Sequence, residues 1–186
     1  AKMGGLRKYL PVTCLTMWAG TLAIAGVPGL AGFFSKDEIL WRTFSNPQGS
    51  SVIWIGGVLV AGLTAFYMFR LMFLPFYGRE RLDSHVAHHV HESPRVMTFP
   101  LVLLAVGSIF AGYLGLPAWL GANVFEGFLE PSFEAAYRIP DHGAVHHGHQ
   151  TEILMTFVSI LIAAIGIYLA YYFFIKREAT AALLQR

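Results

Sequence analysis

The chain has 186 residues, of which 55% are hydrophobic and only 13% charged, and its net charge is +2. About a quarter of the residues of an ordinary soluble domain are charged, so the composition argues against one. The small positive charge forms no basic stripe, which argues against a nucleic-acid partner, and the single cysteine, Cys14, excludes an internal disulfide.

Four long stretches without charged residues divide the chain. They contain 27, 27, 30 and 23 residues and cover positions 9–35, 43–69, 96–125 and 153–175. A membrane-crossing helix needs about 20 mostly apolar residues. We therefore predict an all-α fold, a polytopic transmembrane helix bundle with about four membrane crossings.

The first crossing, residues 10–44, is too long for one straight helix. It would measure about 50 Å at about 1.5 Å per residue, whereas the hydrocarbon core is about 30 Å thick. Pro28 and the glycines Gly26, Gly29 and Gly32 lie within it. Since proline and glycine weaken helices, we predict that helical geometry is lost within 26–32. Such a break is tolerated in a membrane only where protein or cavity water satisfies the backbone, which points to function.

Three continuous spans are expected to follow, at about 52–75, 97–116 and 153–175. Small residues recur at four-residue spacing in two of them, as Ala61 with Ala65 and Gly107 with Ala111. This spacing favours close packing against neighbouring helices.

Lysine and arginine are distributed unevenly between the two sides of this arrangement. Four crossings place the N-terminal segment, the 70–96 loop and the C-terminal tail on one side, which then carries ten basic residues, whereas the other side carries only Arg42 and Arg138. The basic side is therefore predicted to be the cytoplasm or the matrix.

Lys36 and Asp37 are the candidate catalytic residues, as members of a proton relay. They follow the predicted break within an apolar environment that includes Phe33, Phe34 and Trp41. Ionisable residues at membrane depth are costly and usually face a protein interior or a water path. A lysine held between desolvation and the attraction of a carboxylate can readily change its protonation state, which a relay requires.

A purely structural interpretation of the same residues remains open. Ser35 followed three residues later by Glu38 fits the capping box that begins a helix. Glu38 and Arg42 have the i, i+4 order of a helical ion pair. On this interpretation the charges only start a half-helix.

Two loops are rich in histidine, but we expect no metal at either. One contains His85, His88, His89 and His91 followed by Glu92, and the other contains His142, His146, His147 and His149. Such clusters can bind divalent metals, but no cysteine completes a structural zinc site. The first group is expected to order its loop or to contact other subunits. Nucleotide, iron–sulfur and haem motifs are also missing from the sequence, so we expect no cofactor.

Several motifs resemble one family. Met3 to Lys8, Gly32 to Leu40, and His88 to Pro94, together with Arg70 and the aromatic residues that follow it, resemble the L subunit of the proton-translocating NADH:quinone oxidoreductases (complex I) of bacteria and its mitochondrial and chloroplast counterparts. The similarity extends over essentially the whole chain. The chain does not begin with methionine, and we expect it to be the C-terminal part of a longer subunit.

The resemblance implies an antiporter-like fold of two inverted half-repeats, each with a broken helix beside an ion site. Residues 1–78 would then hold the broken helix and the next span of the second half-repeat. Residues 79–96 would form the cytoplasmic histidine-rich loop, and 97–186 the last transmembrane helices with their intervening loop. The implied function is proton translocation coupled to electron transfer, as a subunit of an oxidoreductase that carries no redox site in this chain. The implied partners are other membrane-arm subunits and the lipid bilayer. The implied location is a bacterial inner membrane or an equivalent energy-transducing membrane.

Three alternatives remain at this point. The large subunit of a multi-subunit sodium/proton antiporter shares the broken-helix plan. A metal transporter would use the histidine-rich loops. A structural membrane arm would have no titrating residue.

Overall fold

The structure, a computed structural model, describes residues 3–45, 50–82, 89–115, 127–129, 131–132 and 149–176. Regular structure in these residues is entirely helical, which confirms the all-α prediction. The long helices are α1 (Pro11–Ala25), α2 (Ala31–Ser45), α3 (Ser51–Met72), α5 (Arg95–Phe110) and α7 (His149–Tyr171). Short helical turns are η1 (Leu6–Lys8) before α1, η2 (Phe73–Tyr77) after α3, η3 (Ala111–Leu114) after α5 and η4 (Tyr172–Lys176) after α7.

Three helical segments are long and apolar enough to cross a membrane: Ser51–Tyr77, Arg95–Leu114 and Gln150–Lys176. They agree within a few residues with the three continuous spans predicted from the sequence. Each combines an α-helix with the short turn that follows it. The chain is an integral membrane protein.

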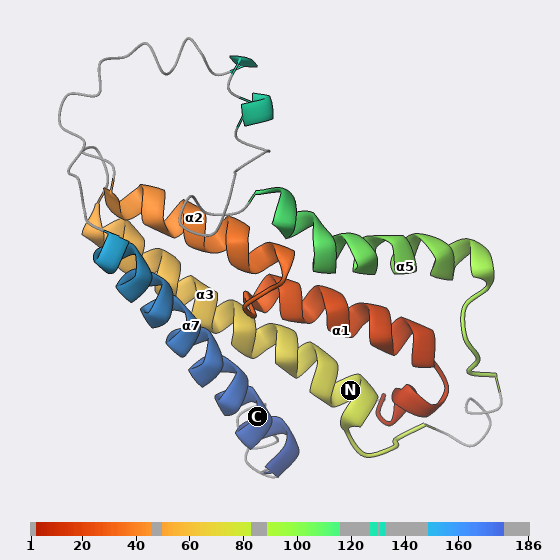
Figure 1. The fold of residues 1–186 in the computed structure, drawn as a ribbon. Helices are drawn as coiled ribbons and strands as arrows, with labels where there is room; N and C mark the ends of the chain where they lie inside the picture. Colours follow the sequence, from red (N-terminus) through yellow and green to blue (C-terminus); the bar gives the residue numbers. More distant parts are fainter. Residues whose placement is uncertain are drawn as a thin grey trace.

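The first predicted crossing is broken where the sequence indicated. Helix α1 ends at Ala25 and α2 begins at Ala31, so the interruption falls within the predicted range. Each half has 15 residues and is about 22 Å long at about 1.5 Å per residue, which is less than the hydrocarbon core. Figure 1 shows α2 continuing in the general direction of α1 instead of doubling back, while α3 returns the opposite way.

Helix α3 packs closely along α7, and small residues permit this approach (Figure 1). A Cβ atom added to Gly166 would lie within 2.4 Å of the Gly62 carbonyl oxygen, so the two backbones nearly touch. Ala61 and Ala65 are buried, as expected from their spacing. At Gly107, no atom of another described helix lies within 4 Å of where its Cβ would be, so its part of the expectation stays a prediction.

Many large apolar side chains are exposed, as in a protein surrounded by lipid or by further helices. Helix α5 has no buried residue, and the exposed fractions of Val96 and Phe99 are 84% and 71%. The apolar interior is small: one cluster lies between α1, α3 and α7, and a second lies where η1 and α1 meet the end of α3.

Candidate functional site

The break between α1 and α2 is built by glycines with left-handed backbone conformations. Gly26 has φ 77° and Gly29 has φ 89°, a region that other residues adopt only with strain. The Gly26 N–H donates to the Ala23 carbonyl, and the Val27 N–H donates to the Leu22 carbonyl at 3.1 Å. This is the Schellman arrangement that ends many helices. Glycine and proline therefore stop α1 by a defined set of hydrogen bonds.

Lys36 reaches back from α2 to the end of α1. Its ammonium group donates to the Ala25 carbonyl oxygen at 3.4 Å, and the side chain is half-buried. A Cβ on Gly26 would lie 2.2 Å from the Lys36 Nζ atom, so the lysine lies directly over the break. The last carbonyls of a helix have no partner in the helix and carry partial negative charge, which makes this a favourable place for a cation.

Asp37 points to a different helix. Its Oδ1 atom accepts a hydrogen bond of 2.8 Å from the hydroxyl of Ser159, a buried residue of α7. Its Oδ2 atom is buried and has no hydrogen-bond partner among the described residues. Adjacent residues on a helix point about 100° apart, and this is why Lys36 faces α1 while Asp37 faces α7.

A small cavity lies beside Asp37, between α2 and α7. Its volume is about 10 Å³, which is close to the smallest space that holds one water molecule. It is lined by three acidic residues, two phenylalanines and two other side chains: Asp37, Glu38, Glu152, Phe33, Phe34, Trp41 and Thr156. Asp37 therefore borders a space large enough for about one water molecule, while its Oδ2 atom is itself buried.

The capping-box interpretation of Ser35 is wrong. Helix α2 already begins at Ala31, so Ser35 lies inside it, and its hydroxyl turns back to the Ala31 and Gly32 carbonyls at 3.4 and 3.5 Å. Lys36 and Asp37 accordingly lie in the second turn of a helix rather than at its start. The capping explanation for these charges is removed.

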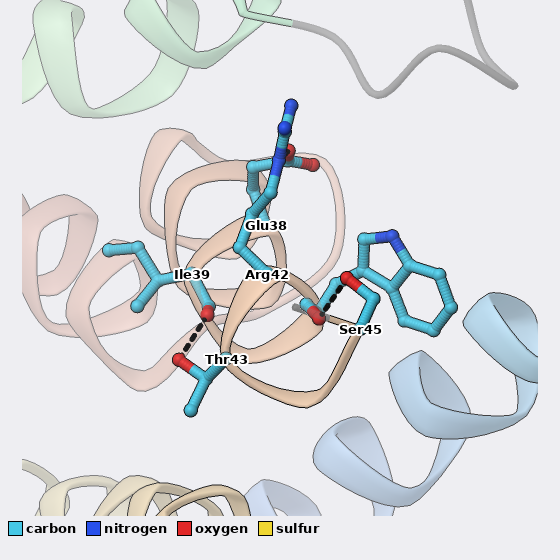
Figure 2. A network of polar contacts seen from close by, with 6 residues as sticks. Glu38, Ile39, Arg42, Thr43 and Ser45 are labelled. Atoms are coloured by element: carbon cyan, nitrogen blue, oxygen red, sulfur yellow. Dashed lines mark hydrogen bonds and ion pairs between the residues drawn. The ribbon is translucent and has the colours of Figure 1, made fainter. Parts of the chain in front are cut away.

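The Glu38–Arg42 ion pair is confirmed. The Arg42 Nε atom lies 2.6 Å from a Glu38 carboxylate oxygen, and 59% of the Arg42 side chain is exposed. Figure 2 shows the pair running along one side of α2, with the Thr43 and Ser45 hydroxyls turned onto backbone carbonyls of the same helix. An exposed pair of this kind contributes about 0.5 kcal/mol or less.

Most of the histidine residues that the sequence singled out lie outside the described residues: His85, His88, His142, His146 and His147. In the described part of the chain, no three histidine, cysteine or acidic side chains are grouped so as to hold a metal ion. His91 is described, and its Nδ1 atom lies 3.0 Å from the Glu92 carbonyl oxygen, so it contacts its own loop. That neither loop binds a metal ion remains a prediction.

Ser159 and the cavity were not expected from the sequence. Ser159 lies in an apolar span 122 residues from Asp37, and nothing in its local pattern says which helix it meets. The only sequence feature that could have pointed to Ser159 is a hydroxyl side chain within a stretch without charged residues.

The sequence matches the model of a known transmembrane family, the NADH:quinone oxidoreductase/Mrp antiporter family, over residues 1–69. It is 43% identical to NAD(P)H-quinone oxidoreductase chain 5 of a Picosynechococcus species, with 98% of this chain and 29% of the relative aligned. It is 44% identical to NADH-quinone oxidoreductase subunit L of Rhodobacter capsulatus (69% of this chain, 19% of the relative). The corresponding subunit of Mycobacterium tuberculosis is 40% identical (91% and 25%). The chain thus spans less than a third of the length of these relatives.

Proposed function

Because the chain belongs to the NADH:quinone oxidoreductase/Mrp antiporter family of transmembrane proteins, we propose that it forms part of a membrane-arm subunit that translocates protons during quinone reduction. The observation that carries this proposal is the position of Lys36, whose ammonium group lies over the helix break. A titratable group beside an interrupted helix is the arrangement in which transporters hold ions near the middle of the membrane.

Lys36 is the proposed proton carrier. Its ammonium group is held by the Ala25 carbonyl, which favours the protonated form, while partial burial costs that form its hydration. A small change in a neighbouring charge can therefore shift its protonation. The carrier then takes or releases a proton without moving far.

Asp37 is the proposed second member of the relay. The Ser159 hydrogen bond holds one carboxylate oxygen in place, the other oxygen is buried without a partner among the described residues, and Asp37 lines the adjacent cavity. Lys36 and Asp37 face different helices, so the pair connects the break with the α2–α7 cavity. A proton passing between them would cross from one side of α2 to the other.

The remaining assignments follow the same proposal. Residues 1–78 hold the broken helix and next span of the second half-repeat, 79–96 the cytoplasmic loop, and 97–186 the last spans of the unit. Other subunits of the assembly carry the electrons. The partners of this chain are the other subunits of the membrane arm. The membrane is an energy-transducing one. Relatives named as quinone oxidoreductase subunits favour this assignment over a sodium/proton antiporter.

The test is to reconstitute the purified assembly that contains this chain into sealed vesicles and to supply its electron donor and a quinone. Proton uptake or release that depends on quinone reduction and proceeds unchanged without sodium supports the proposal. Exchange of sodium for protons with no electron donor would support the antiporter instead.

A further inference from the structure

Helix α1 begins without a capping residue of its own. Its N-cap residue is Leu10, whose side chain cannot accept a hydrogen bond, Pro11 follows as the first helical residue, and the first turn contains no acidic residue. The first N–H groups of a helix have no partner inside the helix. This end of α1 therefore needs an acceptor from elsewhere in the chain.

Glu92 supplies that acceptor from a distance of 80 residues along the chain. One oxygen of its carboxylate accepts from the Val12 N–H at 2.7 Å and from the Thr13 N–H at 3.4 Å. The other oxygen accepts from the Thr13 hydroxyl at 2.6 Å. A single carboxylate thus caps the helix and binds a side chain of its first turn.

Charge favours the same contact. The N-terminus of a helix carries partial positive charge, so an anion there is stabilised. Partial burial raises the pKa of the Glu92 carboxyl, but hydrogen bonds from the Thr13 hydroxyl and from backbone N–H groups outweigh this and hold the pKa below its ordinary value. Glu92 is therefore ionised at neutral pH.

Two residues separate Glu92 from the start of α5, which runs beside α1 (Figure 1). The far end of α5 meets the start of α2. A Cβ on Gly112 would lie 2.5 Å from the Ala31 Cα atom, and the Tyr113 and Phe34 rings lie 5.5 Å apart. The segment from Glu92 to Tyr113 therefore contacts the first turn of α1 at one end and the first turns of α2 at the other.

We propose that Glu92 is a positioning residue that fixes α1 against α5, and through α5 sets how far the end of α1 lies from Lys36. The two halves of the broken helix are joined by only five residues between Ala25 and Ala31. A tie outside the break adds to the direct contacts between the two halves, such as the Lys36–Ala25 hydrogen bond. The effect on proton transfer rests on the function proposed above for Lys36, whereas the tie itself does not.

Cys14 provides a built-in reporter of the tie. It follows Thr13 in α1, is only 4% exposed, and packs with Leu6, Met72 and Phe76. Val90, from the segment that leads to Glu92, packs against the same cluster. Release of Glu92 should uncover the thiol. Alkylation of Cys14 in the assembled complex can be followed by mass spectrometry of the peptide that contains it.

The experiment compares Glu92→Ala, Glu92→Gln and Glu80→Ala complexes. We expect Cys14 to be alkylated several-fold faster in Glu92→Ala, and at an intermediate rate in Glu92→Gln, which keeps an uncharged acceptor. Glu80→Ala is the matched control, because Glu80 lies in the same loop and accepts, at 2.7 Å, from the hydroxyl of Tyr9, which precedes α1. Unchanged alkylation in Glu92→Ala, or an equal rise in the control, overturns the proposal.

A second readout separates positioning from general destabilisation. Protons translocated per quinone reduced should fall in assembled Glu92→Ala and recover in part in Glu92→Gln. Adding Glu92→Ala to Lys36→Met should cause no further loss, because both act on one step. Independent, additive losses, or normal translocation with an uncovered Cys14, overturn the positioning role. If Lys36→Met alone translocates normally, the proposed function fails, while the alkylation result still decides the tie.

Discussion

The Lys36 ammonium nitrogen lies 3.4 Å from the carbonyl oxygen of Ala25, although the two residues belong to different helices. The carbonyl is one of those that α1 leaves unpaired where it ends. The lysine therefore stabilises the broken end of the helix, and the break gives the buried cation a partner. Any change that moves one of the two groups should affect the other.

Replacing Gly26 by alanine should disturb both the end of α1 and the position of the Lys36 ammonium group. The residue has φ 77°, and a non-glycine residue in this conformation costs about 1–2 kcal/mol. The new Cβ would also lie 2.2 Å from the Lys36 Nζ atom and displace it. We expect the apparent melting temperature of the complex to fall, together with proton translocation.

Gly20→Ala is the matched control for that variant. Gly20 lies within α1, and no described atom beyond the adjacent backbone of that helix lies within 4 Å of where its Cβ would be. Alanine is favoured over glycine inside a helix by about 1 kcal/mol, so thermal stability should be unchanged or slightly higher and translocation normal. Equal losses in both variants would show that the conformation of Gly26 is not the cause.

Ser159→Ala should impair the relay through Asp37. The substitution removes the 2.8 Å hydrogen bond and leaves both carboxylate oxygens without a partner among the described residues. Loss of a partner to a buried polar group costs about 1–3 kcal/mol. We expect slower proton translocation at an unchanged level of assembly, measured in vesicles, and a lower melting temperature.

Ser108→Ala serves as the comparison for Ser159. Within the described part of the chain, the Ser108 hydroxyl donates to the Leu104 carbonyl of its own helix, at 2.9 Å on an exposed face. Loss of this hydroxyl should change neither the rate of proton translocation nor the melting temperature measurably. The interpretation of Ser159 would be contradicted by identical behaviour of the two serine variants.

The capping of α1 by Glu92 should depend on pH in a defined window. The pKa of Glu92 is lowered from 4.5 in the folded protein, so its stabilising effect is present above pH 4.5 and is lost as the pH falls through the folded value. The alkylation rate of Cys14 in the wild type, divided by that in Glu92→Gln, should be constant between about pH 6 and about pH 8. It should approach one only below pH 4.5. A ratio that changes near neutral pH would exclude Glu92 as the group responsible.

The sequence was most informative where a signal is local. Pro28 and its neighbouring glycines predicted the break because proline restricts the backbone and removes a hydrogen-bond donor, while glycine permits left-handed conformations that end a helix. Charge-free stretches predicted the three long helices for the same kind of reason. Local pattern misled at Ser35, because a capping box and the interior of a helix can share the same residue spacing.

Partners of the site could not be predicted, because they depend on which helices meet. Ser159 reaches Asp37, and Glu92 reaches Val12 and Thr13, across separations of 122, 80 and 79 residues. Glu92 belongs to the His88 to Pro94 motif, but the sequence around it does not indicate that α1 lacks a cap of its own. Helix packing supplies that information.

Substitution of Lys36 by methionine tests the central claim most directly. Methionine keeps most of the apolar bulk and removes the titrating group, and Arg42→Met is the control, since Arg42 lies exposed on the same helix. Proton translocation per quinone reduced is measured in reconstituted vesicles that contain equal amounts of assembled complex. The account predicts a large loss for Lys36→Met and none for Arg42→Met. Undiminished translocation by an intact Lys36→Met complex would contradict it.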